Sequence, residues 1–346
     1  MIKPLKLKAH YASSLAFLSI FSNSQGSFGA KPQMRLPVFQ RTVLLALGFR
    51  INLNVTMADV GEGAYKYPGI PTAELPFLHY PKPTTYTRNE CAWTPVRYFA
   101  IISMQRSGSG WFETLLNSHI NISSNGEIFF VKERRRNVST IMETLDKVYN
   151  LDWYSSASKN ECTGAVGFKW MLNQGLMENQ EDTVEYFKRK GVSSIFLFRR
   201  NLLRRLVSLL ANSHDRDAKQ LNGTHKAHVH SRHEVQAEVL ARFKPLIDVE
   251  SLIPDIKQTR KWSTDILQYF KGTRHMVLYY EDLVRNQAKM MDVLDFLRMP
   301  HAKLTSRHVK IHTRPLSDHI QNWDAVSQAL KGTEYESFLH SDYQRK

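Results

Sequence analysis

The chain has 346 residues, of which 42% are apolar, enough to build one sizeable α/β core with additional segments. This composition excludes a wholly disordered protein. The formal net charge of +15 indicates an anionic partner, but the sequence contains no RNA- or DNA-reading module, so we expect no nucleic-acid partner.

Residues 1–58 form a basic, signal-like targeting segment. They hold seven of the 47 lysines and arginines and no acidic residue. Lys3, Lys6 and Lys8 precede the apolar stretch 11–21, and small polar residues follow it, which is the order of a secretory signal. An organelle transit peptide is the alternative. The apolar stretch is too short to span a bilayer, and membrane association through this segment stays open.

Residues 59–96 are predicted to be a proline-rich stem or linker. Six of the 13 prolines fall between residues 68 and 95, and such a stretch builds neither a helix interior nor a central strand. We therefore expect the catalytic domain to occupy residues 97–346.

The most informative motif is YFAIISMQRSGSGW at residues 98–111. Residues 98–104 are an apolar run typical of a buried parallel strand, and residues 111–119 have the apolar spacing of a helix. Gly108 and Gly110 allow a sharp turn between this strand and this helix. Such a turn directs free backbone N–H groups toward an anion at the N-terminus of the helix. Arg106 adds a permanent charge, and Ser107 and Ser109 add hydroxyl donors. The alternative is an ordinary turn between strand and helix.

Two other phosphate-binding loops are excluded by the residues present. A Walker A loop needs Gly-Lys-Ser/Thr, but Trp111 follows Gly110. A dinucleotide-binding turn needs a third glycine where Glu113 stands, and a carboxylate there would face the pyrophosphate. The motif therefore supports neither ATP hydrolysis nor NAD binding.

Beyond this motif, apolar strand patterns alternate with helical patterns. Strands are predicted at 165–171, 194–198 and 276–283, and helices at 178–189, 202–212, 234–243, 256–270 and 286–297. Such alternation predicts an α/β fold of three layers, in which helices flank a central parallel sheet.

The segment from Arg106 to Trp111 resembles the 5′-phosphosulfate loop of sulfotransferases. Arg200 and Ser208 resemble that family's 3′-phosphate grip, and eight residues of helix bring both to nearly one face. The segments NGEIF at 125–129 and GFKWM at 167–171 resemble the nodulation-protein-like branch, which sulfates carbohydrates. We interpret MVLYYEDL at 276–283 as a strand with an architectural role.

The resemblance implies a P-loop NTPase-like sulfotransferase fold and 3′-phosphoadenosine 5′-phosphosulfate (PAPS) as co-substrate. It also implies a carbohydrate or glycoconjugate acceptor. The residues it assigns to the donor are Arg106, Ser107, Gly108, Ser109, Gly110, Trp111, Arg200 and Ser208. The C-terminal Arg-Lys-Gly signature of the family's cytosolic enzymes is absent, and we expect Lys310 and Arg314 to close over the nucleotide in its place. Trp111 would stack on the adenine, or is part of the core.

Four residues are candidates for the chemistry. Arg106 would stabilise charge on the departing phosphate oxygen, and Glu127 would take the proton of the acceptor hydroxyl. Lys169 would contact the donor sulfate or the acceptor, and His228 is an alternative base. His228 belongs to a histidine-rich stretch at 225–233, but its spacing matches no closed zinc site, so we expect no metal.

The two cysteines, Cys91 and Cys162, each precede a strand. If both strands begin at the same end of the sheet, the sulfurs can pair, and we predict a disulfide. Four N-glycosylation triplets begin at Asn54, Asn121, Asn137 and Asn222. With the resemblance, these features favour the secretory pathway and the Golgi lumen.

Three rival functions remain open from the sequence. A protein-tyrosine sulfotransferase would share the donor site. A P-loop kinase would share the sheet but needs a loop lysine and magnesium ligands. A catalytically silent nucleotide- or glycan-binding protein would keep the grip of Arg200 and Ser208 and tolerate the loss of Glu127.

Overall fold

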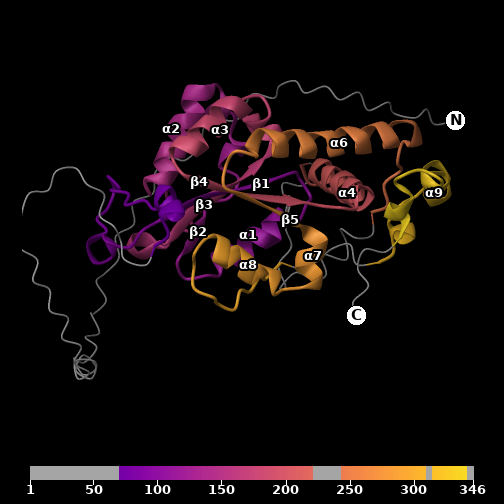
Figure 1. Ribbon diagram of the computed structural model, residues 1–346. Coiled ribbons are helices and arrows are strands. Elements are labelled where there is room, and N and C mark those ends of the chain that lie inside the picture. The colour runs from indigo at the N-terminus through magenta and orange to yellow at the C-terminus, as the bar shows by residue number, and fades with distance from the viewer. Residues whose placement is uncertain (1–69, 221–242, 309–313, 341–346) are drawn as a thin grey trace, which may run out of the picture. The chain divides into compact units, whose positions relative to one another are not determined.

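The structure is a computed structural model that describes residues 70–220, 243–308 and 314–340. A sheet of five parallel strands lies at its centre, in the order β2-β3-β1-β4-β5 (Figure 1). The strands are β1 (Arg97–Ser103), β2 (Ile122–Ser124), β3 (Ala165–Met171), β4 (Val192–Phe198) and β5 (His275–Tyr279).

Helices cover both faces of the sheet, which confirms the predicted three-layer α/β fold (Figure 1). One face carries α2 (Val138–Tyr149), α3 (Gln180–Arg189) and α6 (Val249–Phe270). The other carries α1 (Ser109–Asn117), α7 (Tyr280–Arg285) and α8 (Lys289–Phe296). A third apolar cluster joins α4 (Leu202–Gln220), α6 and α9 (Trp323–Leu330).

Shorter helical segments connect these elements. Short 3₁₀ segments cover Thr72–Phe77, Asn89–Cys91, Ile128–Phe130, Lys132–Arg135, Asn160–Cys162, Leu316–His319 and Glu336–Leu339, and a π turn covers Leu172–Leu176. No helix within the described ranges is both long enough and apolar enough to cross a membrane.

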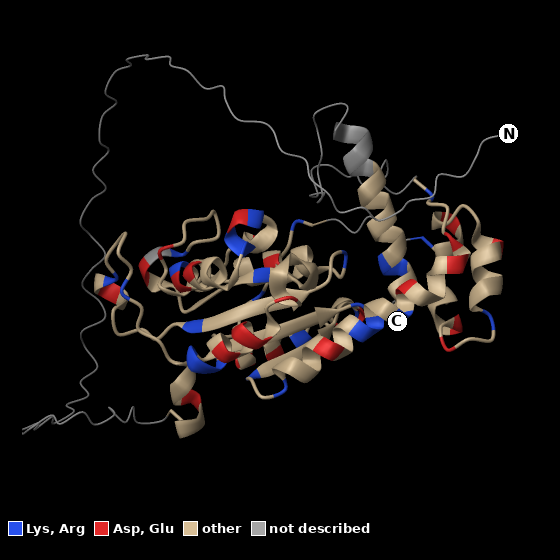
Figure 2. Ribbon diagram, turned by 90° about the horizontal axis from the view of Figure 1, so that it is seen from above, with Lys and Arg blue, Asp and Glu red and all other residues tan. Residues whose placement is uncertain are grey.

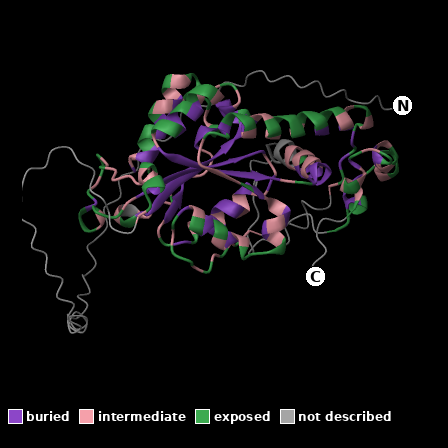
Figure 3. Ribbon diagram, in the orientation of Figure 1, coloured by how far each residue is buried: buried purple, intermediate pink, exposed green. Residues whose placement is uncertain are grey.

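Strand β1 is apolar at successive positions because each of its faces meets a different helical layer. Tyr98, Ala100 and Ile102 belong to the core cluster on one face. Phe99 and Ile101 belong to the cluster on the other face, and the whole strand is buried (Figure 3). This is the packing of a parallel strand between helices, as the apolar run predicted.

Two predicted elements differ from those observed. The strand predicted at 276–283 ends at Tyr279, and α7 begins with Tyr280, so the acidic pair Glu281 and Asp282 lies in the first turn of a helix. Acidic residues suit that position because of the helix dipole. Helix α6 begins at Val249 rather than 256, since Asp248 caps it and Pro254 is accommodated inside. The helix predicted at 234–243 lies almost wholly outside the described residues.

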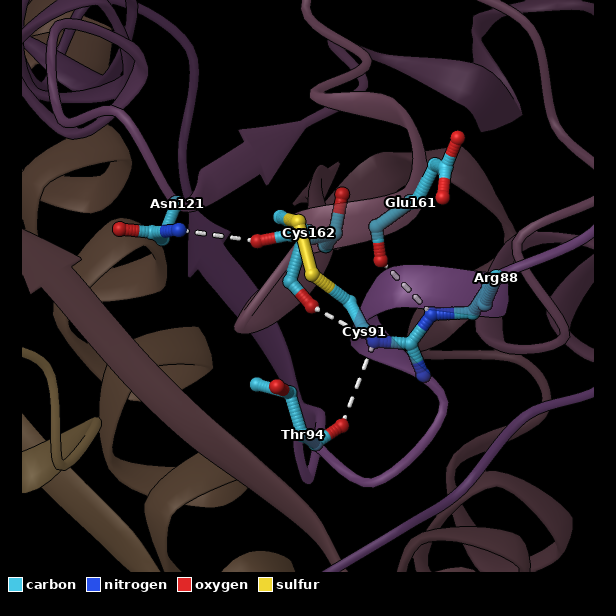
Figure 4. Close-up of a disulfide and its surroundings, with 7 residues drawn as sticks. Arg88, Cys91, Thr94, Asn121, Glu161 and Cys162 are labelled. Atoms are coloured by element: carbon cyan, nitrogen blue, oxygen red, sulfur yellow. Dashed lines mark hydrogen bonds between the residues drawn. A yellow bond between two sulfur atoms is a disulfide. The ribbon is translucent and has the colours of Figure 1, made fainter. Parts of the chain in front are cut away.

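The described part of the expected stem lies against the domain. Cys91 and Cys162 form the predicted disulfide, with their Cα atoms 5.3 Å apart (Figure 4). Arg88 is buried beside it, and its Nε donates to the carbonyl of Glu161 at 2.9 Å. These contacts join residues 88–91 to the segment that leads into β3.

Glu74, in the same proline-rich region, accepts hydrogen bonds from three arginines. Its carboxylate accepts from Arg97 and Arg274, both at 2.6 Å, and from Arg298 at 2.9 Å. Although burial raises its pKa, the hydrogen bonds from these arginines prevail and lower the pKa of Glu74 to about 2. One buried carboxylate thus joins residues from β1, from the turn before β5 and from the segment after α8.

Because the folded-state pKa of Glu74 lies below its ordinary value of 4.5, the group stabilises the fold above pH 5. That stability, about 3 kcal/mol, is lost as the pH falls from about 5 toward 2. We expect Glu74→Gln to lower the free energy of unfolding by about 3 kcal/mol at pH 7, and to remove this part of the acid dependence. Urea unfolding at several pH values measures both effects.

The matched control is Glu90→Gln, because Glu90 is exposed in the same region. It should leave the unfolding free energy within about 0.5 kcal/mol of the parent. Equal stability of the two variants at pH 7 would contradict the role given to Glu74.

Candidate active site

The glycine-serine turn lies where β1 ends and α1 begins, at the carboxyl edge of the sheet. Gly108 has φ +83°, and a Cβ there would lie 2.2 Å from Cδ2 of Tyr280. Only glycine meets both conditions, since other residues disfavour that φ and would overlap the ring. Ser107 is fully buried, and its hydroxyl has no hydrogen-bond partner among the described residues. The turn therefore holds a polar atom that a ligand phosphate can satisfy.

Arg106 extends from this turn to helix α4. Its Nε donates to Oγ of Ser208 at 2.9 Å, and its Nη1 donates to Oδ1 of Asn212 at 3.4 Å. Burial lowers the pKa of Arg106 to about 10, and the charge of Arg199 adds to this. The structure thus brings together two predicted donor-site residues, Arg106 and Ser208, from the loop and from the helix.

Two further arginines lie in the same region. Arg199 follows β4 directly and donates from Nη1 to the carbonyl of Arg106 at 3.3 Å, while its Nε lies 3.8 Å from Oε1 of Glu281. Arg205 lies in α4, and its pKa is lowered to about 10 by burial and by the charge of Arg199. We call Arg106, Arg199 and Arg205 the arginine cluster; the basic first turns of α4 are visible in Figure 2.

Mutual repulsion within the arginine cluster favours an anion. Like charges in a partly buried site destabilise one another, and a phosphate relieves this while accepting charge-assisted hydrogen bonds. The first turn of α1 adds the backbone N–H groups of a helix N-terminus. These residues fit a doubly phosphorylated nucleotide such as the implied PAPS.

Arg200 points elsewhere in the structure. Its guanidinium pairs with Asp282, with Nη2 to Oδ2 at 2.8 Å, and stacks 4.1 Å from the ring centre of Tyr279. Its hydrogen bond to Asp282 raises its pKa, and its side chain is 48% exposed. The structure therefore does not bring Arg200 and Ser208 together through a hydrogen bond, and their shared grip on a phosphate stays a prediction.

The acidic pair of α7 shapes the turn between β4 and α4. Glu281 is buried and accepts from the backbone N–H groups of Arg200 at 3.0 Å and Asn201 at 3.2 Å. Asn201 in turn accepts from the backbone N–H of Arg204 at 2.9 Å, as a helix cap does. Glu281 thus fixes the direction of α4, which agrees with an architectural reading of the YEDL segment.

Lys169 lies on β3 between two carboxylates. Its Nζ is 3.1 Å from Oε2 of Glu113 and 3.4 Å from Oε1 of Glu127. Burial lowers the pKa of Lys169, but these two carboxylates prevail and raise it, so the ammonium is charged at neutral pH. Glu127 also accepts from Gln174 at 2.9 Å, and its side chain is 30% exposed.

Glu113 holds the turn that carries Glu127. One of its oxygens accepts from Oγ of Ser124 at 2.7 Å and from the backbone N–H of Gly126 at 2.9 Å. The sequence predicted Lys169 and Glu127 separately, and the structure brings them together. It also adds Glu113, which the sequence used only to exclude a dinucleotide site, and Gln174.

The remaining predicted residues divide into three groups. Trp111 is half-buried against the core and meets Tyr280 edge-on, with ring centres 5.7 Å apart. Arg314 is exposed, and its carbonyl accepts from Arg204 at 3.3 Å. Lys310 and His228 lie outside the described residues. Within the described ranges, no group of three or more His, Cys, Asp or Glu side chains could hold a metal ion.

Taken with the fold, this arrangement defines an α/β protein with a candidate anion-binding site at the carboxyl edge of its sheet, the usual ligand position in such folds. No family model matches the chain. Two curated relatives do, both named Nodulation protein H, from Rhizobium meliloti and from Rhizobium meliloti (strain 1021). Each is 25% identical over 253 residues, covering 71% of this chain and 96% of the relative.

These relatives support assignment of the chain to the sulfotransferase family, as its motifs predicted, and so to an enzyme of that class. Two solved structures are also similar. A sulfotransferase from Alicyclobacillus acidocaldarius has a TM-score of 0.36, is 13% identical and covers 71% of this chain and 96% of its own. The sulfotransferase domain from the curacin biosynthetic pathway has a TM-score of 0.33 and is 16% identical. That match covers 72% of this chain and 93% of the other chain.

The turn at Gly108 provides a direct test of the site's geometry. We expect Gly108→Ala to cost about 1 kcal/mol for its positive φ and at least about 1 kcal/mol more for the overlap with Tyr280. Affinity for adenosine 3′,5′-bisphosphate should fall as well, because the loop must shift. Urea unfolding and calorimetric titration measure the two effects.

Gly332→Ala is the matched control, because Gly332 has φ +72°, nothing lies within 4 Å of the place its methyl group would take, and it follows α9. Gly332→Ala should lose only the stability that the positive φ costs, about 1 kcal/mol, and its affinity for the nucleotide should be unchanged. If both variants lose the same stability and bind alike, the close contact between Gly108 and Tyr280 is not a constraint on this site.

Proposed function

We propose that the protein transfers the sulfuryl group of PAPS to a hydroxyl of a carbohydrate or glycoconjugate. The observation that carries this proposal is the arginine cluster beside the turn at Ser107, because it offers positive charge to a nucleotide with two phosphate groups, next to a Ser107 hydroxyl that has no hydrogen-bond partner among the described residues. The relationship to Nodulation protein H supports the class of reaction.

Arg106 and the backbone N–H groups of the first turn of α1 would stabilise negative charge on the departing phosphate. When bound, PAPS supplies the activated sulfuryl group. The protein's contribution is to fix the position of the donor and to neutralise its charge, and both effects are large in a partly buried site. Arg106 suits this role because Ser208 and Asn212 hold its guanidinium in one orientation.

Glu127 is the proposed base for the acceptor hydroxyl. Lys169 and Gln174 hold its carboxylate in place, and its partial exposure leaves a side open to an acceptor. The ammonium of Lys169 lies between the carboxylates of Glu127 and Glu113, so its positive charge is shared between the two. Lys169 thereby acts on the acceptor side of the site.

The same reasoning extends to location. The disulfide between Cys91 and Cys162 and the signal-like segment 1–58 both support an oxidising compartment, and we propose the lumen of the secretory pathway. The Golgi is the proposed organelle because the resemblance of the motifs to carbohydrate sulfotransferases implies it.

Replacement of the proposed base tests the function. We expect Glu127→Gln to reduce sulfuryl transfer by about 100-fold or more, because the amide cannot accept the proton. The dissociation constant for adenosine 3′,5′-bisphosphate should stay within about twofold of the parent. The assay uses ³⁵S-labelled PAPS with a panel of glycans and tyrosine peptides, with and without a chelator.

The control variant is Glu133→Gln, an exposed glutamate six residues further along. It should retain full transfer. If the label appears on tyrosine peptides and on none of the glycans, the acceptor is a protein tyrosine and not a carbohydrate. Unchanged transfer by Glu127→Gln would remove Glu127 as the base, and donor binding without any transfer would favour the silent binding protein.

A further inference from the structure

Glu113 is a buried carboxylate to which the proposed reaction gives no direct part. Its side chain, on α1, is 10% exposed, and both of its oxygens are engaged. Oε1 accepts from Oγ of Ser124 at 2.7 Å and from the backbone N–H of Gly126 at 2.9 Å. Oε2 lies 3.1 Å from Nζ of Lys169. Gly126 and Lys169 are also the two neighbours that determine where Glu127 lies.

Gly126 immediately precedes Glu127, and hydrogen bonds hold it from two sides. Glu113 accepts from its N–H, and its carbonyl accepts from the backbone N–H of Lys169 at 2.9 Å. Its φ is +75°, and no described atom beyond its chain neighbours lies within 4 Å of the place where a Cβ would stand. Packing therefore does little to hold this residue. The hydrogen bonds to α1 and β3 fix the direction in which the chain enters Glu127.

The ammonium of Lys169 lies between two carboxylates, and Glu113 is the closer one. Nζ is 3.1 Å from Glu113 and 3.4 Å from Oε1 of Glu127. Although burial lowers the pKa of Lys169, the charge of Glu113 and then that of Glu127 raise it. The other oxygen of Glu127 accepts from Gln174. Without the charge of Glu113, the ammonium would be drawn to Glu127 and would occupy the oxygen that Gln174 leaves open.

We propose that Glu113 is a positioning residue for the transfer step. It holds the peptide of Gly126, and it draws the ammonium of Lys169 away from Glu127, so that one oxygen of Glu127 stays open to the acceptor hydroxyl. Glu113 acts through these two residues and not on the substrates. The inference rests on the proposed function, in which Glu127 is the base.

The first test is Glu113→Gln in the full chain, assayed with ³⁵S-labelled PAPS and a glycan that the parent protein sulfates. The amide oxygen can still accept from Ser124 and Gly126, so this variant removes the charge and keeps the hydrogen bonds of the turn. We expect kcat to fall by about tenfold or more, because Lys169 then engages the open oxygen of Glu127. The dissociation constant for adenosine 3′,5′-bisphosphate should stay within about twofold of the parent.

The double variant Glu113→Gln/Lys169→Gln shows whether this effect passes through the ammonium. With no ammonium to occupy Glu127, it should transfer label at least about threefold faster than Glu113→Gln alone. A merely structural role for Glu113 predicts the opposite result. In that case a second substitution in the same buried cluster would deepen the loss.

Glu74→Gln is the matched control. Glu74 is also buried and ion-paired, but its partners Arg97 and Arg274 belong to the amino edge of the sheet. This variant should be less stable than the parent and yet keep kcat within about twofold, at a temperature where circular dichroism shows both proteins folded.

Three results would overturn the inference: a kcat of Glu113→Gln within about twofold of the parent, a loss no larger than that of Glu74→Gln, or a double variant no faster than Glu113→Gln. Failure of the proposed function looks different. In that case the parent transfers no label, or Glu127→Gln transfers it as fast as the parent does.

Discussion

Repulsion among three arginines at one edge of the sheet is the constraint on which this site depends. Arg106, Arg199 and Arg205 come from the loop after β1, the end of β4 and the start of α4, and the charge of Arg199 acts on both of the others. A fold that buries this much like charge is stabilised by a ligand of opposite charge. The parallel sheet makes the arrangement possible, because all its strands end at the same edge.

Strand β1 separates two halves of the site with different chemistry. On one side, β4 and α4 supply the cations that would bind the donor. On the other side, β3 and the turn after β2 supply Lys169 and Glu127, which would handle the proton of the acceptor. Glu113 links the two halves. It belongs to α1, which begins at the glycine-serine turn, and its carboxylate pairs with Lys169. One short helix thus joins the proposed donor side of the site to the proposed acceptor side.

Local patterns predicted the fold better than they predicted side-chain partners. The apolar run of β1, the glycine turn and the alternation of strands and helices are fixed by nearby residues, so the three-layer architecture could be read from the sequence. The partners of Arg200 could not, because Asp282 lies 82 residues away and belongs to a helix that the sequence suggested was a strand. Arg205 was missed for a related reason. Its spacing from Ser208 was visible, but only the structure shows that acidic partners engage Arg200 and not Arg205.

The most direct test of the account is chemical unfolding of the intact chain titrated with adenosine 3′,5′-bisphosphate. If the arginine cluster binds this anion, the free energy of unfolding should rise with ligand concentration and gain about 2.7 kcal/mol at 100 times the dissociation constant. Adenosine diphosphate at the same concentration should stabilise the chain less, because both of its phosphates are on the 5′ side. No stabilisation by millimolar bisphosphate, or equal stabilisation by both nucleotides, would contradict the account.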